Sequence, residues 1–121
     1  IEFLKKSGVY KFECSKNCSL YIGQTRRDLE TRGKEHLKDF DFRRFERSPV
    51  AEHMEEFKYE NHNFSINNLS LIKEVNDPFL VKTWESFFIH KFKKQNFNLL
   101  NKDSGVINSS TVFDIAINFK Y

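Results

Sequence analysis

The segment LYIGQTRRDLETRGKEHL, from Leu20 to Leu37, decides how this sequence is interpreted because it begins as a strand and ends as a helix. Apolar and polar side chains alternate as far as Gly23, and the residues that follow repeat with the period of a helix. On that helix Arg32 and His36 stand four residues apart, so their side chains share one face. The segment therefore predicts a cation and an imidazole close to the end of a strand.

The helix in this segment has a predicted start and a predicted close contact. Thr25, with Asp28 three positions later, resembles a capping box, which predicts a helix from about Arg26 to Phe40. A glycine inside a helix costs about 1 kcal/mol relative to alanine, so we expect another element to approach Gly33 closely. The expected buried face consists of Leu29, Gly33, Leu37 and Phe40.

The regions around this segment predict a small α/β fold. GVYKFEC (residues 8–14) and CSLYIG (18–23) read as a β-hairpin, and NLSLIKEV (68–75) predicts a third strand. We expect a three-stranded antiparallel sheet flanked by helices, with Ser48 and Pro49 starting the second helix. The remaining expected elements are a loop at 40–47, a helix at 50–59, a long helix at 79–95 that follows Asp77 and Pro78, an extended stretch at 97–101 and a last helix at 111–119.

Length and composition predict one globular domain. The chain has 121 residues, of which 39% are hydrophobic and 14 are Phe, enough for a single core. A mean hydropathy of −0.63 and the lack of a long apolar run argue against a membrane span. Because the chain begins at Ile1 with no leader pattern, we expect a single domain, residues 1–121, from a larger protein.

Positive charge is concentrated in the first part of the chain. Residues 1–50 carry 12 Lys and Arg against 8 acidic residues, a balance of +4, whereas residues 51–121 carry 8 against 9, a balance of −1. Paired cations are typical of contacts to backbone phosphates, although they also occur on ordinary solvated faces. The candidate DNA-binding residues are Arg26, Arg27, Arg43, Arg44, Lys93 and Lys94.

A carboxylate is predicted on the apolar face of the long helix. At about 100° per residue, Val81, Trp84, Phe88 and Phe92 occupy an arc of about 80°, and Glu85 projects within it. Burying an unpaired charge there would cost several kcal/mol, so Glu85 must be protonated, paired with an arginine or bound to a cation. A structural ion pair and a metal ligand at the edge of a cleft are both consistent with the pattern.

Five features of the sequence occur in an order that matches a known family. They are Gly-Val-Tyr at residues 8–10, Tyr-Ile-Gly at 21–23, a helix with Arg32 and His36, a later helix with Glu85, and Asn101 at a strand end. In content and order they resemble the GIY-YIG endonuclease superfamily, with the first tripeptide reading Gly-Val-Tyr. The resemblance covers about residues 7–105 and leaves 106–121 as a C-terminal extension.

Further motifs resemble one branch of that superfamily. YIGQT, TRGKEH and SPVAEH, with two cysteines between the two tripeptides, are similar to the endonuclease domain of Penelope-like retroelements. The resemblance implies DNA as partner, a reverse-transcriptase domain in the same polypeptide and a nuclear location. It also implies a nick whose 3′-hydroxyl primes cDNA synthesis.

The resemblance also implies roles for individual residues. Glu85 would hold Mg²⁺ or Mn²⁺ against the scissile phosphate, and Arg32 would offer a fork of donors to the same phosphate. Tyr10 would be the general base, a role that requires its pKa to fall far below about 10. The supporting residues would be Tyr21, which positions water or phosphate, His36, which hydrogen-bonds Tyr10 or takes up its proton, and Asn101, which anchors the site.

Two cysteines and two histidines form a second candidate site. Cys14 and Cys18 lie on the hairpin, and His53 and His62 lie on or just after the second helix. This composition suits a structural Zn²⁺, although the separation of the histidines is wider than in finger-type sites. The resemblance to the Penelope-like branch also implies a set of two cysteines and two histidines that accompanies the nuclease. Free thiols or a disulfide are the alternatives.

Three functions remain compatible with the sequence. The first is a metal-dependent DNA-nicking domain of a retroelement, and the second is a GIY-YIG nuclease of repair, homing or restriction type. The third is a catalytically silent nucleic-acid-binding module, which would have no use for a carboxylate on a core-facing position.

Overall fold

The sheet has three antiparallel strands, as the sequence predicts. The computed structural model describes residues 2–102. The strand order is β2 (Leu20–Thr25), β1 (Gly8–Glu13) and β3 (Leu69–Glu74), with β1 in the centre. The second strand begins two residues later than expected because Cys14 to Ser19 form the hairpin turn, in which the Cys14 amide donates to the Ser19 carbonyl.

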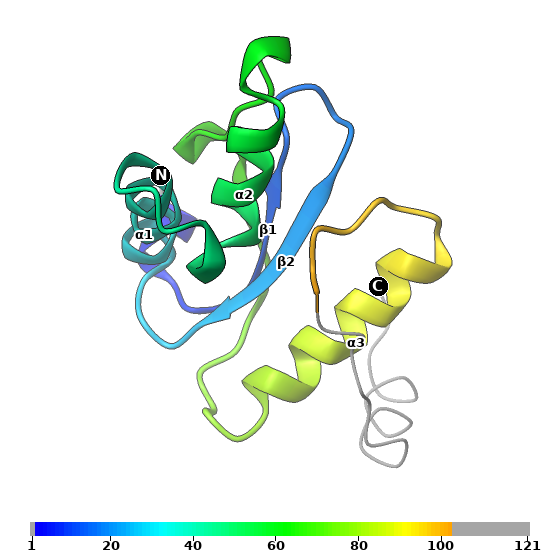
Figure 1. Cartoon of the computed structure of the whole chain (residues 1–121). Coiled ribbons are helices and arrows are strands. Elements are labelled where there is room, and N and C mark those ends of the chain that lie inside the picture. The colour runs from blue at the N-terminus through cyan, green and yellow to red at the C-terminus, as the bar shows by residue number, and fades with distance from the viewer. Residues whose placement is uncertain (1, 103–121) are drawn as a thin grey trace.

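Helices cover both faces of this sheet. In Figure 1, α1 (Leu29–Asp41) and α2 (Pro49–Glu56) lie on one side of β1 and β2, and α3 (Val81–Lys94) lies on the other. Each side has its own apolar core, the first around Phe12 and the second around Ile22. Short 3-10 helices are η1 (Glu2–Lys5), η2 (Phe45–Arg47), η3 (Lys58–Glu60) and η4 (Ile66–Asn68).

The predicted start of α1 is wrong by about one turn. The N-cap is Asp28, whose carboxylate accepts a hydrogen bond from the Thr31 amide at 2.9 Å. Thr25 instead ends β2, where its buried hydroxyl accepts from the Arg27 amide at 3.1 Å. The Thr25 side chain is therefore used in the turn before the helix, and the capping function passes to Asp28.

Two of the predicted helix features are confirmed by contacts. A Cβ atom at Gly33 would lie 2.6 Å from Cδ2 of Leu69 on β3, so the close approach expected there is present. Ser48 is the N-cap of α2 and Pro49 its first residue, and the Ser48 hydroxyl accepts from the Ala51 amide at 3.2 Å. These contacts fix how α1 and α2 meet the sheet.

The start of α3 also lies later than predicted. The Leu80 and Val81 amides both donate to the Asp77 carbonyl, so Asp77 to Leu80 form a turn and the helix begins at Val81. The extended stretch after α3 joins the outer edge of β2 through a parallel bridge between Leu20 and Leu99. The helix predicted at 111–119 and the proposed extension 106–121 lie outside the described residues. Within residues 2–102, no helix is both long and apolar enough to cross a bilayer.

Candidate active site and metal centre

Three aromatic rings meet between the sheet and α1. Tyr10 of β1 is fully buried, and its phenolic oxygen lies 2.8 Å from Nε2 of His36. The ring centroid of Tyr21, on β2, lies 5.2 Å from that of His36 and 6.3 Å from that of Tyr10. The helical period predicts His36 beside the buried face of α1, whereas the structure places it wholly inside the core. The hairpin and α1 thus bring three of the predicted site residues together.

Gly23 makes room for the Tyr10 ring. The two residues are directly paired across β1 and β2. A Cβ atom at position 23 would overlap the Cζ and Oη atoms of Tyr10. The glycine of the Tyr-Ile-Gly segment is therefore a steric requirement of where the phenol lies.

We expect Gly23→Ala to displace the Tyr10 ring and to destabilise the domain, because overpacking a core costs about 1–3 kcal/mol. Thermal unfolding measures the loss. The matched control is Gln24→Ala, since Gln24 is the half-buried next residue of the same strand. A loss of equal size in the two variants would show that the ring does not depend on this glycine.

Arg32 connects the aromatic cluster to an open cleft. Its side chain is 26% exposed, and its Nη1 lies 3.2 Å from the carboxylate of Glu35, which also pairs with Arg27. The cleft has a volume of about 470 Å³. Its lining residues are Arg27, Arg32, Glu35, Lys38, Asp39, Arg44 and Arg47. Five cations face two carboxylates, so the cleft is positively charged.

The environment raises the pKa values of both tyrosines. Burial raises the pKa of Tyr10 well above its ordinary value; Tyr21 and Glu85 raise it further, and the Arg32 guanidinium opposes them. Burial is also the main cause of the raised pKa of Tyr21, again with Glu85 raising and Arg32 lowering it. Both phenols are therefore neutral at pH 7. A cation near Glu85 would act in the opposite sense and lower both pKa values.

Glu85 reaches this cluster from the opposite side of the sheet. It lies on α3, where it is half-buried rather than fully buried as its place on the apolar arc predicts. Its carboxylate raises the pKa values of both Tyr10 and Tyr21, so it lies within electrostatic range of the two phenols. A carboxylate of this kind suits a hard cation such as Mg²⁺, which prefers oxygen ligands.

Asn101 holds the outer edge of β2. Its side-chain Nδ2 donates to the Ile22 carbonyl at 2.6 Å, and its Oδ1 accepts from the Ile22 amide at 3.0 Å. Ile22 stands between Tyr21 and Gly23. These two hydrogen bonds of the Asn101 side chain therefore fix the strand segment that carries the second tripeptide.

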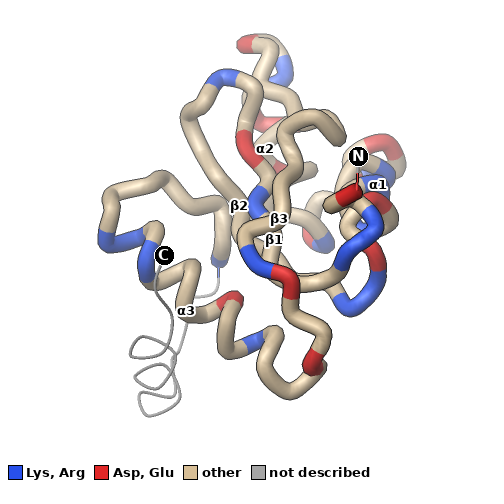
Figure 2. Tube along the Cα trace, turned by 180° about the vertical axis from the view of Figure 1, so that it is seen from behind, with Lys and Arg blue, Asp and Glu red and all other residues tan. Residues whose placement is uncertain are grey.

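The predicted basic pairs occupy separate places. Figure 2 shows Lys and Arg both beside α1 and at the C-terminal end of α3, where Lys93 and Lys94 are exposed. Arg27 and Arg44 line the cleft, and Arg44 pairs with Asp39 at 3.0 Å. Outside the lining, Arg26 donates to the Pro78 carbonyl, and Arg43 pairs with Glu55.

The family model of the GIY-YIG catalytic domain matches residues 6–98, which hold both tripeptides, α1 and the whole of α3. The chain belongs to the GIY-YIG family. This is a family of nucleases that act on DNA, so the superfamily predicted from the sequence is confirmed. Neither a curated protein nor a solved structure matches the chain.

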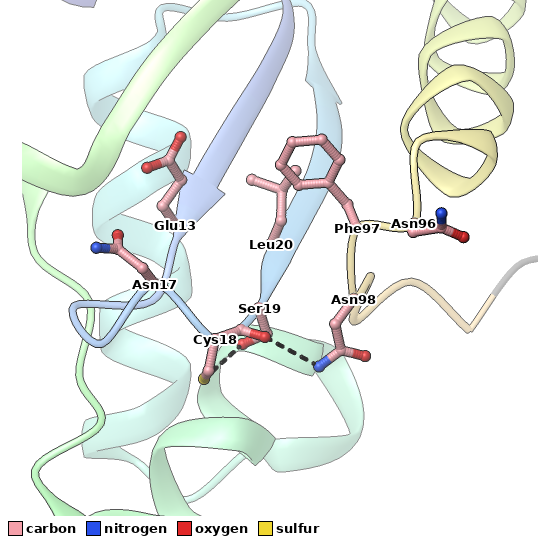
Figure 3. Close-up of a pocket in the computed structure, with 8 residues that line it drawn as sticks. All are labelled: Glu13, Asn17, Cys18, Ser19, Leu20, Asn96, Phe97 and Asn98. Carbon is pink, nitrogen blue, oxygen red and sulfur yellow. Dashed lines mark hydrogen bonds between the residues drawn. The ribbon is translucent and has the colours of Figure 1, made fainter.

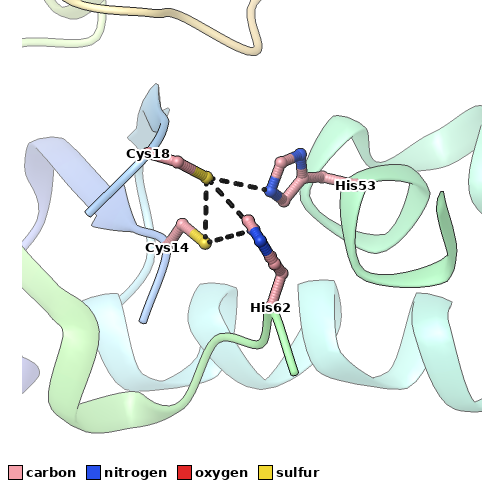
Figure 4. Close-up of side chains that lie close together, drawn as sticks. All are labelled: Cys14, Cys18, His53 and His62. Atoms are coloured by element: carbon pink, nitrogen blue, oxygen red, sulfur yellow. Dashed lines mark hydrogen bonds between the residues drawn. The ribbon is translucent and has the colours of Figure 1, made fainter. Parts of the chain in front are cut away.

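The GIY-YIG domain also carries a cluster of metal-ligating side chains at the end of the hairpin. Figure 4 shows Cys14 and Cys18 facing His53 of α2 and His62, which follows η3. One ligand atom from each residue lies within 4.8 Å of the others. The four residues predicted as a zinc site are therefore brought together, and they could hold a metal ion.

Four of the six separations between these ligand atoms are close to those around a tetrahedral ion. The Cys14 and Cys18 sulfurs are 3.4 Å apart, and each lies within 3.4 Å of His62 Nδ1. The Cys18 sulfur lies 3.6 Å from His53 Nε2. Zinc bonded to sulfur at about 2.3 Å and to nitrogen at about 2.0 Å would separate its ligands by roughly 3.3 to 3.8 Å. Burial lowers the pKa of His53, which favours the neutral ring that metals bind.

A hollow of about 320 Å³ shares one residue with this Cys and His cluster, and Figure 3 draws the residues that line it. Cys18 belongs to both the hollow and the cluster. The Asn98 side chain, which also lines the hollow, donates a hydrogen bond to the Cys18 carbonyl at 3.2 Å. The lining consists of Glu13, Asn17, Cys18, Ser19, Leu20, Asn96, Phe97 and Asn98. Since Tyr10, Arg32 and the basic cleft do not contribute to it, the hollow is separate from the candidate active site.

Sequence reasoning missed three residues around the candidate active site. Ser48 is identified only as a helix cap, yet its hydroxyl also lies 2.6 Å from Nδ1 of His36. Lys38 and Arg47 line the cleft beside Arg32 without having been singled out. The Ser-Pro pair indicated that Ser48 caps a helix, but it did not indicate the contact with His36. Nothing in the local sequence indicates that Lys38 and Arg47 share a cleft with Arg32.

Proposed function

We propose that this domain is a metal-dependent endonuclease that nicks DNA by hydrolysing a phosphodiester bond. One observation supports this most strongly. Arg32, which lines a basic cleft, adjoins the buried pair of Tyr10 and His36, and Glu85 acts electrostatically on the same tyrosine. A module that only binds DNA would need the basic cleft, but it would not need a carboxylate that acts on the Tyr10 and Tyr21 phenols.

Hydrolysis of DNA requires an activated water, stabilisation of negative charge in the transition state and stabilisation of the leaving oxygen. Arg32 meets the second need, because a planar guanidinium can donate two hydrogen bonds to one phosphate. In the absence of DNA, Glu35 holds this guanidinium at 3.2 Å. An incoming phosphate would take the place of that carboxylate.

Tyr10 is the proposed general base and Tyr21 the group that orients the water or the phosphate. Burial keeps Tyr10 neutral in the free domain, so it must lose its proton when substrate binds. The charge of Arg32 favours that loss, and Glu85 opposes it until a cation compensates the carboxylate. Glu85 would hold Mg²⁺ or Mn²⁺, which supplies Lewis-acid stabilisation of the phosphate and of the leaving 3′-oxygen.

The DNA backbone is proposed to follow the cleft. Arg27, Arg44, Lys38 and Arg47 line it together with Arg32 and offer successive charges to a phosphate chain. Glu35 and Asp39 each pair with arginines of the lining, which holds those side chains in place before DNA arrives. Lys93 and Lys94, at the far end of α3, would contact a more distant part of the duplex, and Arg26 and Arg43 would reach the backbone from the rims.

Within the GIY-YIG family, we propose that this domain belongs to the Penelope-like retroelements. The motifs YIGQT, TRGKEH and SPVAEH support it, and so does the tetrahedral spacing of Cys14, Cys18, His53 and His62, for which we propose a structural Zn²⁺. A reverse-transcriptase domain in the same polypeptide and a nuclear location belong to this proposal. Repair, homing and restriction nucleases would share the active site and differ in the flanking protein.

The ends that the domain leaves on DNA test the proposal. We expect supercoiled plasmid to become open circle first in Mg²⁺ and to remain intact in chelator. We expect a DNA polymerase to extend the nicks without prior treatment, because hydrolysis at the 3′-oxygen leaves a 3′-hydroxyl. Nicks that require a phosphatase before extension would contradict the priming role, and absence of nicking in Mg²⁺ and Mn²⁺ would favour a silent binding module.

A further inference from the structure

An exposed aromatic ring lies beside the basic cleft. Phe42 directly follows the last residue of α1 and is 65% exposed. The guanidinium of Arg44, which lines the cleft, lies over this ring, with its central carbon 5.0 Å from the ring centroid. The ring is therefore in contact with the wall of the cleft, while most of its surface is open to solvent.

The backbone at the end of α1 fixes this arrangement. The Arg43 amide donates to the Phe40 carbonyl, and the amide of the next residue donates to the Asp39 carbonyl. These are the two hydrogen bonds of a Schellman motif, and Arg43 adopts the left-handed conformation that the motif requires, with a φ of 59°. Arg44 is also held by its ion pair with the buried Asp39 carboxylate at 3.0 Å. The cation under the Phe42 ring thus has a defined position.

The other exposed aromatic side chains lie elsewhere. Tyr59 is 87% exposed and has the Lys58 ammonium over its ring, but Lys58 does not line the cleft. Phe97 is 48% exposed and lines the separate hollow. Within residues 2–102, Phe42 is the one exposed aromatic side chain over which a cation of the cleft lies.

The surroundings of the Phe42 ring suit a nucleobase. Five cations and two carboxylates line the cleft, which favours a polyanion. The face of an aromatic ring is electronegative and does not attract phosphate oxygens, whereas it stacks well on a planar base. In an undisturbed duplex the faces of each base are covered by its neighbours, so a base that is free to stack on a protein ring is unpaired or unstacked.

We propose that Phe42 stacks on an unpaired base of the DNA strand whose phosphates follow the cleft. The Arg44 guanidinium supports the ring on one face and leaves the other face to the base. The preferred substrate is then DNA with single-stranded character next to the bound phosphates. This inference rests on the proposed path of DNA along the cleft, and it does not depend on hydrolysis.

Two single strands test the stacking without cleavage. One is a thymidine oligonucleotide, and the other is an abasic strand of equal length that keeps the sugars and the phosphates. In chelator we expect the wild-type domain to bind the thymidine strand about 5- to 150-fold more tightly, which is the contribution of one stack between a base and an aromatic ring. Phe42→Ala should lose this preference, and Phe42→Trp, which keeps an aromatic ring, should retain it.

Continuous duplex tests the substrate class. Phe42→Ala should bind it with the affinity of the wild type, because no unpaired base is available to the ring. An equal loss of affinity for duplex and for the thymidine strand would show that the ring does not select unpaired bases, and it would overturn the proposed substrate class.

Salt dependence separates stacking from a charge contact. The slope of log affinity against log salt on the thymidine strand should be the same in the wild type and in Phe42→Ala. Arg44→Ala should reduce that slope by about 0.7, the value for one phosphate contact on a single strand. The matched control is Tyr59→Ala, which removes an exposed ring with a cation over it outside the cleft lining. It should retain the affinity, the base preference and the slope.

The outcomes separate this inference from the nuclease proposal. A wild-type domain that binds the two strands equally, or binds neither, would overturn the inference, and so would a preference that persists in Phe42→Ala. A dimer in light scattering that dissociates in Phe42→Ala would assign the ring to a second copy of the chain and would also overturn it. A preference that depends on Phe42 in a domain that nicks no DNA would support the inference and contradict the proposed nuclease function.

Discussion

Glu85→Ala is expected to lower Mg²⁺-dependent nicking at least about 100-fold while DNA affinity stays close to that of the wild type. Cleavage would lose the carboxylate that holds the cation, whereas binding depends on several Lys and Arg contacts to phosphates. The fold should persist, because Glu85 is half-buried and its removal relieves a desolvation cost. A plasmid-nicking time course measures the rate, and titration with labelled DNA in chelator measures the affinity.

The matched control is Glu60→Ala, which removes an exposed carboxylate of η3 that is not among the residues lining the cleft. It should nick at the wild-type rate. If Glu85→Ala also nicked at the wild-type rate in Mg²⁺, the cation role given to this carboxylate would be wrong.

Removal of the proposed Zn²⁺ by a chelator is expected to produce the second large effect, a loss of about 10 °C or more in the melting temperature. The cluster ties Cys14 and Cys18 of the hairpin to His53 of α2 and to His62, and metal binding at such a site contributes directly to folding. Native mass spectrometry should find one Zn²⁺ per chain before chelation and none afterwards. Cys14→Ser should reproduce the loss in the absence of chelator.

His90→Ala is the control for this experiment, because His90 is exposed on α3 and is not among the clustered residues. It should retain the ion and the melting temperature. A purified domain that is free of metal and melts at the same temperature with and without chelator would leave Cys14 and Cys18 as ordinary thiols.

The three strands and the start of α2 were predictable from the sequence. Alternation located β1, β2 and β3, and Ser48 with Pro49 located α2. The start of α1 was wrong because Thr25 and Asp28 are both good caps, and local sequence does not say that the Thr25 hydroxyl is already used in the preceding turn.

The buried part of the site was less predictable. Helical periodicity places His36 beside an apolar face, but its full burial results from the N-terminus of α2 packing against it through Ser48. That contact depends on the path of residues 42–47, where Arg43 adopts a left-handed backbone with a φ of 59°. The same path brings Arg44 and Arg47 into the cleft, which a pattern of paired cations cannot specify.

The most direct test of the account compares Arg32→Ala with Arg26→Ala in a single-turnover nicking assay in Mg²⁺, with DNA affinity measured in parallel. Arg32 lines the cleft next to Tyr10, whereas Arg26 is exposed in the loop before α1, outside the cleft lining, and its side chain donates to the Pro78 carbonyl. Loss of a donor that acts on transition-state charge costs about 100- to 1000-fold in rate. We predict that loss for Arg32→Ala with affinity within about threefold, and a near wild-type rate for Arg26→Ala. Equal rates for Arg32→Ala and the wild type would contradict the central claim that this cluster hydrolyses DNA.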